Sequence, residues 1–279
     1  AQDGTANQPT IPAYMVRLAD KTAIVGAHGA STTIEATLQY FFNSVNNDYF
    51  GDDFSSQGPT DVDFRVKPDV IAPGHFVLSS IPLSWCGGAS CWAFLEGTSM
   101  AAPHLAGSAA VVLGQHPDWS AAQVRSAVVN TADATAVKDP STSVSITDVN
   151  AIGSGRLNLD SAVSAKVGLD PVSVSFGAVP HGDSQTLTYN LTLTNLDSSP
   201  HIFSLSVEST TCPGETTCNG VSYSISPASI SSLAAGASAS ATVTMTAAKG
   251  SSLGGHQAKL TVNIGSTEVA HAAVYTRIK

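Results

Sequence analysis

The segment LEGTSMAAPHLAG, residues 95–107, decides how this chain of 279 residues is interpreted. Gly97 and Thr98 predict a tight entry into a helix that starts at Ser99 and continues to about Gln115. The first N–H groups of a helix have no partners inside the helix, and the macrodipole is positive there, so an oxyanion is stabilised at this position. Serine is also a frequent helix N-cap, and the G-T-S tripeptide by itself favours that structural role.

Later residues of the same segment support this placement of the helix. Pro103, counted from Ser99, is four residues into the helix, where its missing N–H removes little, whereas one turn later it would break the helix. Ala101 and Ala102 leave room for the close approach of a neighbouring segment. Because the stretch up to about Gln115 is apolar on almost every side, we expect this helix to be buried inside a domain.

Composition argues against several classes of function. Only 12% of the residues are charged, and acidic residues are in excess, with a formal net charge of −9. A chain without a basic footprint is not expected to bind nucleic acid or an anionic membrane. No apolar run approaches the length of a membrane-spanning helix, and the initial stretch AQDGTANQPT is too polar for a signal peptide. We therefore expect no nucleic-acid partner and no membrane partner.

The first part of the chain is typical of an α/β layer. The apolar, β-branched run RVKPDVIAPG (65–74) ends at a Pro-Gly turn, and FVLSSI (76–81) follows as a second predicted strand. After a break at HPDW comes the predicted helix SAAQVRSAVVNTA, in which Ser120 and Gln123 have capping-box spacing. Strand, helix and helix, all poor in charge, predict an α/β arrangement.

The pattern changes past about Ala165. Short runs such as QTLTYNLTLTNL and SASATVTMTAA alternate Ser or Thr with apolar residues, and turns rich in Gly, Pro and Asp separate them. Alternation with a period of two, in short and evenly spaced runs without a helical segment, is typical of an all-β domain. We interpret residues 167–279 as a β-sandwich of about seven strands.

The cysteines fall in two close pairs, Cys86 with Cys91 and Cys212 with Cys218. Each pair brackets a loop rich in Gly, Ser or Thr, of the kind that a disulfide closes in an oxidising compartment. Free thiols and a metal site are the alternatives, but no histidine neighbours either pair at the spacing of a zinc site. We predict two disulfides and a secreted, extracellular protein.

The stretch GTSMAAPHLAG resembles the serine motif of the subtilisin-like serine peptidases, the subtilases. Its motif residues in this sequence are Gly97, Thr98, Ser99, Pro103 and His104. Further blocks resemble the family in the same order, namely FSSQGPT (54–60), KPDVIAPG (67–74), HPDWSAAQVRSAVVNTA (116–132) and GSGRLNLDSAV (153–163). The resemblance implies that Ser99 is the acylating nucleophile and that its own backbone N–H is one oxyanion donor.

The sequence offers no convincing general base. His104 points away from Ser99 around the helix, at about 100° per residue, and the family's histidine at this place is structural. His28, in AHGAS, has the His-Gly pair of the family's histidine motif but is followed by TTIEATL instead of the rest of that motif. His75 and His116 follow turns. The remaining histidines lie in the predicted sandwich: His181, His201, His256 and His271.

The order of the family's motifs accounts for the missing groups. Subtilases run Asp, His, Asn and then Ser, and many secreted members carry a protease-associated insert between Asn and Ser. The stretch IPAYMVRLADKTAI (11–24) resembles the end of that insert, and VSFGAVPHGDSQTLTYNLTLTN (174–195) resembles a fibronectin type III-like domain. The resemblance implies an insert tail at 1–27, the C-terminal part of a catalytic domain at 28–166, and the fibronectin type III-like sandwich at 167–279.

We therefore expect part of a secreted serine endopeptidase. The catalytic Asp, the catalytic His and the oxyanion Asn are missing, so we expect the chain to be inactive alone. Its expected partners are a polypeptide substrate and the missing N-terminal catalytic half. The alternative is a degenerate, non-catalytic subtilase that serves as a binding or adhesive module. The intact motif around Ser99 argues against that alternative.

Two smaller features remain. Asn190 begins the glycosylation tripeptide NLT, which is common by chance and lies within a predicted strand. The acidic stretch NNDYFGDDF, ending at Phe54, lacks the spacing of an EF-hand loop, so we interpret it as a solvated turn instead of a calcium site. We expect no metal and no cofactor, and calcium stays open as an alternative that no motif in the sequence supports.

Overall fold

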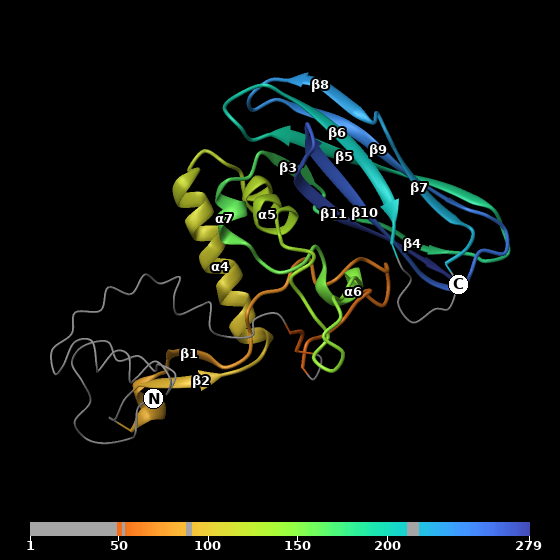
Figure 1. The fold of residues 1–279 in the computed structure, drawn as a ribbon. Coiled ribbons are helices and arrows are strands. Elements are labelled where there is room, and N and C mark those ends of the chain that lie inside the picture. The colour runs from red at the N-terminus through yellow and green to blue at the C-terminus, as the bar shows by residue number, and fades with distance from the viewer. Residues whose placement is uncertain (1–48, 52–53, 88–90, 211–217) are drawn as a thin grey trace. The chain divides into compact units, whose positions relative to one another are not determined.

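The structure is a computed structural model that describes residues 49–51, 54–87, 91–210 and 218–279 (Figure 1). The chain divides into two compact units, one formed by residues 1–47 and 76–96 and the other by residues 48–75 and 97–279. Strands predominate and helices are few. No helix in the described ranges has the length and apolarity needed to cross a membrane.

The described part of the first unit is a small hairpin. Strand β1 (Val77–Ser80) pairs antiparallel with β2 (Trp92–Leu95), and the one-turn helix α3 (Leu83–Cys86) lies between them in the chain. A disulfide joins Cys86 to Cys91 and closes the loop between α3 and β2. The first predicted disulfide is therefore confirmed.

The second unit begins with the helical part of the structure. Its helices are α4 (Thr98–Gln115), α5 (Ala121–Asn130), α6 (Val149–Ile152) and α7 (Leu159–Val163). The predicted capping box is confirmed at the start of α5, where Gln123 N donates to Ser120 Oγ and Ser120 N donates to the Gln123 side chain. One apolar cluster packs α4, α5 and α7 together through Val112, Val124 and Ala162.

The expectation that the serine helix is buried is wrong for the described structure. Only Ser108 and Val112 of α4 are buried, while Val111 and Leu113 are each 46% exposed. The helix packs on α5 and α7 through residues that include Leu105 and Val112, and Leu105 also contacts the cluster that contains Val70. Composition showed that α4 is apolar all round, but not which of its faces meets a partner.

The rest of the second unit, residues 167–279, consists of two sheets and is called the two-sheet region below. One sheet has the order β4-β11-β10-β6-β8 and the other β3-β5-β9-β7. The strands are β3 (Val167–Asp170), β4 (Val174–Val179), β5 (Gln185–Asn195), β6 (His201–Ser209), β7 (Val221–Ser226), β8 (Ser229–Leu233), β9 (Ser238–Ala247), β10 (Gly254–Ile264) and β11 (Thr267–Ile278). Neighbours are antiparallel except β4 and β11, which run parallel.

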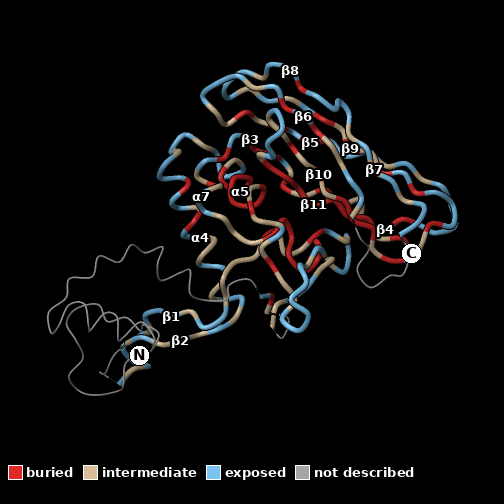
Figure 2. Tube along the Cα trace, in the orientation of Figure 1, coloured by how far each residue is buried: buried red, intermediate tan, exposed pale blue. Residues whose placement is uncertain are grey.

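The inner faces of both sheets share one hydrophobic core. Leu191 and Leu193 of β5 are fully buried while Thr192 between them is exposed, as the period of two predicts. Phe203 of β6 and Leu260 of β10 reach the same core from the other sheet. Figure 2 shows this buried layer running between the sheets, with exposed residues on their outer faces.

The described part of the two-sheet region holds nine strands, more than the expected number of about seven. Short breaks at the Asp170–Pro171 and Ser226–Pro227 bonds separate β3 from β4 and β7 from β8. At each of these prolines the chain passes from one sheet to the other, since β3 and β7 belong to the four-stranded sheet and β4 and β8 to the five-stranded sheet.

Candidate active site

The turn before Ser99 depends on two glycines that touch. Gly97, the residue before α4, has φ 137°, a backbone conformation that other residues rarely adopt. Its N–H donates to Gly74 O at 2.7 Å. A Cβ on Gly74 would lie 2.8 Å from Gly97 O, closer than such atoms approach. The end of the KPDVIAPG block and the start of the serine motif therefore pack backbone against backbone.

Ser99 is the second residue of α4 and is exposed. The next two N–H groups, of Met100 and Ala101, both donate to Gly97 O, at 3.0 and 3.4 Å. The N–H of Ser99 itself has no backbone acceptor among the described residues. This arrangement places a hydroxyl and an N–H that has no backbone acceptor among the described residues at the positive end of a helix, where an oxyanion is stabilised.

The helix starts one residue earlier than the sequence suggested, at Thr98, and Pro103 is its sixth residue. In a regular helix the N–H of residue 103 would donate to the carbonyl of Ser99. Proline has no N–H, so that bond is missing. Pro103 therefore leaves the carbonyl of Ser99 without the helical hydrogen bond that another residue at position 103 would donate. The expectation that the missing N–H removes little did not include this bond.

A small ladder supports the segment that leads to this turn. Ile71 N donates to Gly155 O at 2.9 Å, and Leu157 N donates to Ile71 O at 2.8 Å. Gly153 has φ +59°, and a Cβ there would lie 2.3 Å from Asp69 O. The KPDVIAPG and GSGRLNLDSAV blocks, far apart in the sequence, are therefore neighbours in the structure.

The carboxylate of Asp69 is a feature that the sequence analysis missed. Its Oδ2 accepts hydrogen bonds from Lys67 Nζ at 2.7 Å and from Arg125 Nη2 at 3.0 Å. These contacts connect α5 to the segment that supports the serine turn. Asp69 and Arg125 lie in separate motif blocks, and no local spacing in the sequence pairs them.

The described histidines are engaged away from Ser99. His104 Nδ1 bonds to Met100 O at 2.8 Å, within its own helix. His116 Nε2 bonds to Val163 O at 2.8 Å and stacks on Trp119. His75 stacks with Phe54. No hydrogen bond joins a histidine to Ser99 within the described ranges, and His28 lies outside them.

Two other sequence predictions fall partly outside the described residues. Cys218 is disulfide-bonded, but Cys212, its predicted partner, is not among the described residues. Most of the acidic stretch that ends at Phe54 is likewise outside them. Within the described ranges, no group of three His, Cys, Asp or Glu residues is placed to hold a metal ion.

The chain is similar to known proteins over the segment that contains the serine turn. The family model described as "Subtilase family" matches residues 44–155. The chain is 32% identical over 196 residues to the "Minor extracellular protease Vpr" of Bacillus subtilis, an alignment that covers 69% of this chain and 24% of that protein. It is 39% identical over 92 residues to the "Subtilisin-like protease SBT2.5" of Arabidopsis thaliana, covering 28% and 11%. These similarities place the chain among the serine peptidases. It belongs to the subtilase family.

The alignments also limit what the similarity conveys. The chain spans 24% of the Bacillus relative and 11% of the plant relative. Among solved structures, the PapD-like domain of human CEP192 is 14% identical, covering 41% of this chain and 86% of that one, with a TM-score of 0.29. A TM-score this low carries no argument about the fold.

Proposed function

We propose that this chain carries the nucleophile of a serine endopeptidase, and that the nucleophile is Ser99. Its hydroxyl oxygen attacks the carbonyl carbon of a peptide bond, the C–N bond breaks, and the amine leaves with a proton. Water then hydrolyses the acyl-enzyme and restores the serine. The observation that carries this proposal is the exposed Ser99 at the start of α4, with its N–H unpaired among described backbone groups.

The general base belongs to a segment outside this sequence, as do the acid that orients it and a second oxyanion donor. Three observations support this part of the proposal. No described histidine bonds to Ser99, α4 exposes Val111 and Leu113, and the relatives are several times longer than their alignments with this chain. A serine hydroxyl without a base is a poor nucleophile at neutral pH, so the isolated chain is inactive.

The protein acts outside the cell. The disulfide between Cys86 and Cys91 favours an oxidising compartment, and the Bacillus relative is named an extracellular protease. We assign residues 1–27 to the end of a protease-associated insert, 28–166 to the catalytic domain and 167–279 to a fibronectin type III-like domain. The start of β3 at Val167 is compatible with the last of these boundaries.

Labelling with a fluorophosphonate probe tests the proposal. The 279-residue chain should label slowly or not at all, and the same chain joined to an upstream subtilase segment with catalytic Asp and His should label rapidly. Ser99→Ala in the joined protein should abolish labelling and peptide hydrolysis, whereas Ser164→Ala, at an exposed serine outside the motif, should change neither. Rapid labelling of Ser99 in the isolated chain would contradict the missing base. A joined protein that folds but does not label would favour the degenerate binding module.

A further inference from the structure

The strand β7 is an edge of the four-stranded sheet, and among the described strands it pairs only with β9. An edge strand presents a row of backbone N–H and C=O groups that can pair with another chain, so proteins usually block it with charges, proline, bulges or a covering segment. The described edge strands of the two-sheet region are β3, β4, β7 and β8, and they differ in how they are blocked.

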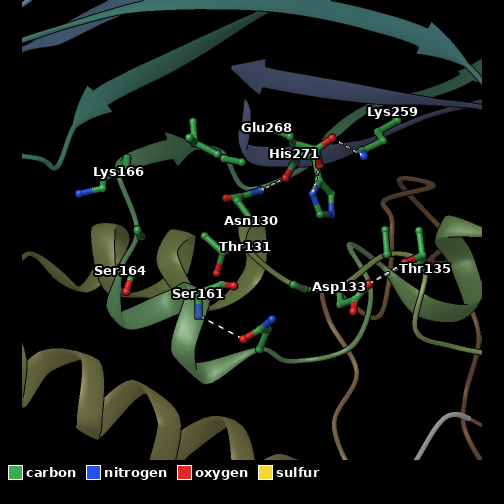
Figure 3. Close-up of a pocket in the computed structure, with 16 residues that line it drawn as sticks. Asn130, Thr131, Asp133, Thr135, Ser161, Ser164, Lys166, Lys259, Glu268 and His271 are labelled. Atoms are coloured by element: carbon green, nitrogen blue, oxygen red, sulfur yellow. Dashed lines mark hydrogen bonds and ion pairs between the residues drawn. The ribbon is translucent and has the colours of Figure 1, made fainter. Parts of the chain in front are cut away.

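The edge at β3 is covered by α5. Leu169 N of β3 donates to Ser126 Oγ of α5 at 2.6 Å. At the same junction between the helical part and the two-sheet region, Asn130 at the end of α5 donates to His271 O of β11 at 2.8 Å (Figure 3). A further strand therefore cannot pair with β3 unless α5 moves away.

The edges at β4 and β8 are irregular. β4 has a register shift in its pairing with β11, and Gly177 in this strand has φ +74°. β8 has a register shift in its pairing with β6, and Ser232 in this strand has φ +46°. Irregularities of this kind twist an edge and disturb the row of groups that another strand would need.

β7 has none of these features among the described residues. It pairs with β9 in continuous register from Val221 to Ser226. The strand, VSYSIS, contains neither a charged residue nor proline. β7 is therefore a regular and uncharged edge, of the kind that pairs readily with another strand.

One hydrogen bond shows which backbone groups of β7 face the open side. Ala248 N donates to Gly220 O at 2.7 Å, and the register places these two residues opposite each other. Along an antiparallel pair, residues alternate between those whose N–H and C=O point to the neighbouring strand and those whose groups point away. The N–H and C=O groups of Val221, Tyr223 and Ile225 therefore point away from β9. Within the described ranges, none of the backbone hydrogen bonds outside the strand ladders involves these three residues.

The side chains of β7 alternate in a way that suits pairing with a second copy of the same strand. Val221, Tyr223 and Ile225 are half-buried and pack against the core clusters, while the serines between them are exposed. Directly opposite residues of an antiparallel pair lie on the same face. A second β7 therefore places apolar side chains opposite apolar ones and serine opposite serine, with no charge on either face.

One register gives a partner to every outward group. With a two-fold axis at Tyr223, Val221 lies opposite Ile225 of the second copy and Tyr223 lies opposite itself, so each outward N–H meets a C=O. With the axis at Ser224, Val221 would lie opposite Pro227, which has no N–H. The register centred on Tyr223 therefore forms more hydrogen bonds.

We propose that β7 pairs antiparallel with β7 of a second copy of this chain, with Tyr223 on the two-fold axis. The pairing joins the two four-stranded sheets into one continuous sheet. Because a short edge contact buries less surface than a standard protein–protein interface, the dimer is weak and forms reversibly at high protein concentration. This contact does not depend on the role proposed for Ser99.

Sedimentation of the complete chain over a range of concentrations, together with amide hydrogen exchange, tests the proposal without any activity measurement. The chain should change reversibly from monomer to dimer as its concentration rises. Exchange at the amides of Val221, Tyr223 and Ile225 should slow in step with the fraction of dimer. The amides of Ser222 and Ser224, which point to β9, should be protected at every concentration.

Charged variants test the register. Ser222 of one copy lies opposite Ser224 of the other, so the double variant Ser222→Lys with Ser224→Lys places like charges opposite each other and should stay monomeric. Mixed with Ser222→Glu with Ser224→Glu, it should form a heterodimer. The matched control is Thr188→Lys with Thr192→Lys, which adds the same charge on the exposed face of β5, a strand that is not an edge, and should still dimerise.

Four results would overturn the proposal, and the first two need no variant. The complete chain could stay monomeric at its highest soluble concentration. The amides of Val221, Tyr223 and Ile225 could already be protected in the monomer, which would mean that the edge is covered within one chain. A dimer that persists in the folded lysine variant would place the contact on another surface. A mixture of folded lysine and glutamate variants without heterodimer would contradict the register centred on Tyr223.

Discussion

The two-sheet region and the helical part bury their apolar side chains in different ways. The two-sheet region has an internal core in which both sheets supply fully buried side chains, such as Leu193 and Leu260. The helical part has several small clusters, and its longest helix, α4, leaves most of its surface exposed. Apolar surface that stays in water contributes nothing to stability. We therefore expect the two-sheet region to fold alone and the helical part to depend for its stability on contacts with the two-sheet region.

The largest effect is expected when the two regions are produced as separate fragments. Residues 167–279 produced alone should give a β-type circular dichroism spectrum and a cooperative thermal transition, because their main core lies within that range. Residues 49–166 alone should show no cooperative transition, since they lose the contacts of α5 with β3 and β11. A cooperative transition in the second fragment would contradict the comparison.

Substitutions of single apolar side chains test the same difference in burial between the two regions. Phe203 is fully buried between the sheets, so Phe203→Ala should lower the free energy of unfolding by about 3–5 kcal/mol. Val111 of α4 is 46% exposed, and Val111→Ala should change that free energy by less than about 0.5 kcal/mol. Urea unfolding of the complete chain measures both, and a costly Val111→Ala would show that α4 is covered.

The close backbone approaches in the helical part predict an intermediate effect. Gly155 has φ +122°, and a Cβ there would lie 2.4 Å from Asp133 O. Gly155→Ala should lower the free energy of unfolding by about 1–3 kcal/mol, from the strained conformation alone. Gly236 also has positive φ but nothing within 4 Å, so Gly236→Ala isolates the strain from the steric clash. Equal losses in the two variants would argue against the close approach.

Acid should weaken the junction by a smaller amount. Hydrogen bonds from His271 and from His201 are the main causes that lower the pKa values of Glu268 and Asp197 to about 2. A carboxyl group whose pKa is lowered by folding stabilises the folded state above its unfolded pKa of about 4, and that contribution is lost as pH falls towards 2. Thermal melts between pH 5 and pH 2 should therefore show a steeper loss in the unmodified chain than in Glu268→Gln. Parallel profiles would contradict the assigned cause.

The smallest expected effect is at the surface. Arg125 pairs with Asp69 with its own side chain 55% exposed. Arg125→Ala should cost at most about 1 kcal/mol, and added salt should reduce the difference. A larger loss that persists at high salt would mean that this pair does more than support α5.

The alternation of residues predicted the strands whose two faces differ, such as β5 and β9. It did not predict β11, because most of that strand is buried on both faces and reads as a run of Ala, Val and Tyr. The exposure of α4 was also not predicted. The composition of this helix shows that it is apolar, but not which of its faces packs against another segment. His271 could not be assigned a role from sequence, since its acceptor, the Ser154 carbonyl, is supplied by a distant segment.

The serine motif was different because its chemistry is local. Gly97, Ser99 and Pro103 lie within one turn or two of the same helix, so their spacing alone predicts where they fall. The disulfide of Cys86 and Cys91 is local in the same sense. Asp69 and Arg125 meet only after folding, and no pattern in the sequence marked them.

The position of β11 in its sheet has a consequence during synthesis on the ribosome. Among the described strands, β4 pairs only with β11, and β11 lies between β4 and β10. Since domains form as the chain emerges, β4 has no partner in its sheet until nearly all of this sequence has been translated. His271, whose ring contacts the Ser154 carbonyl, is carried by the same late strand. A ribosome that stalls before β11 therefore leaves β4 without its sheet partner and Ser154 without its contact to His271.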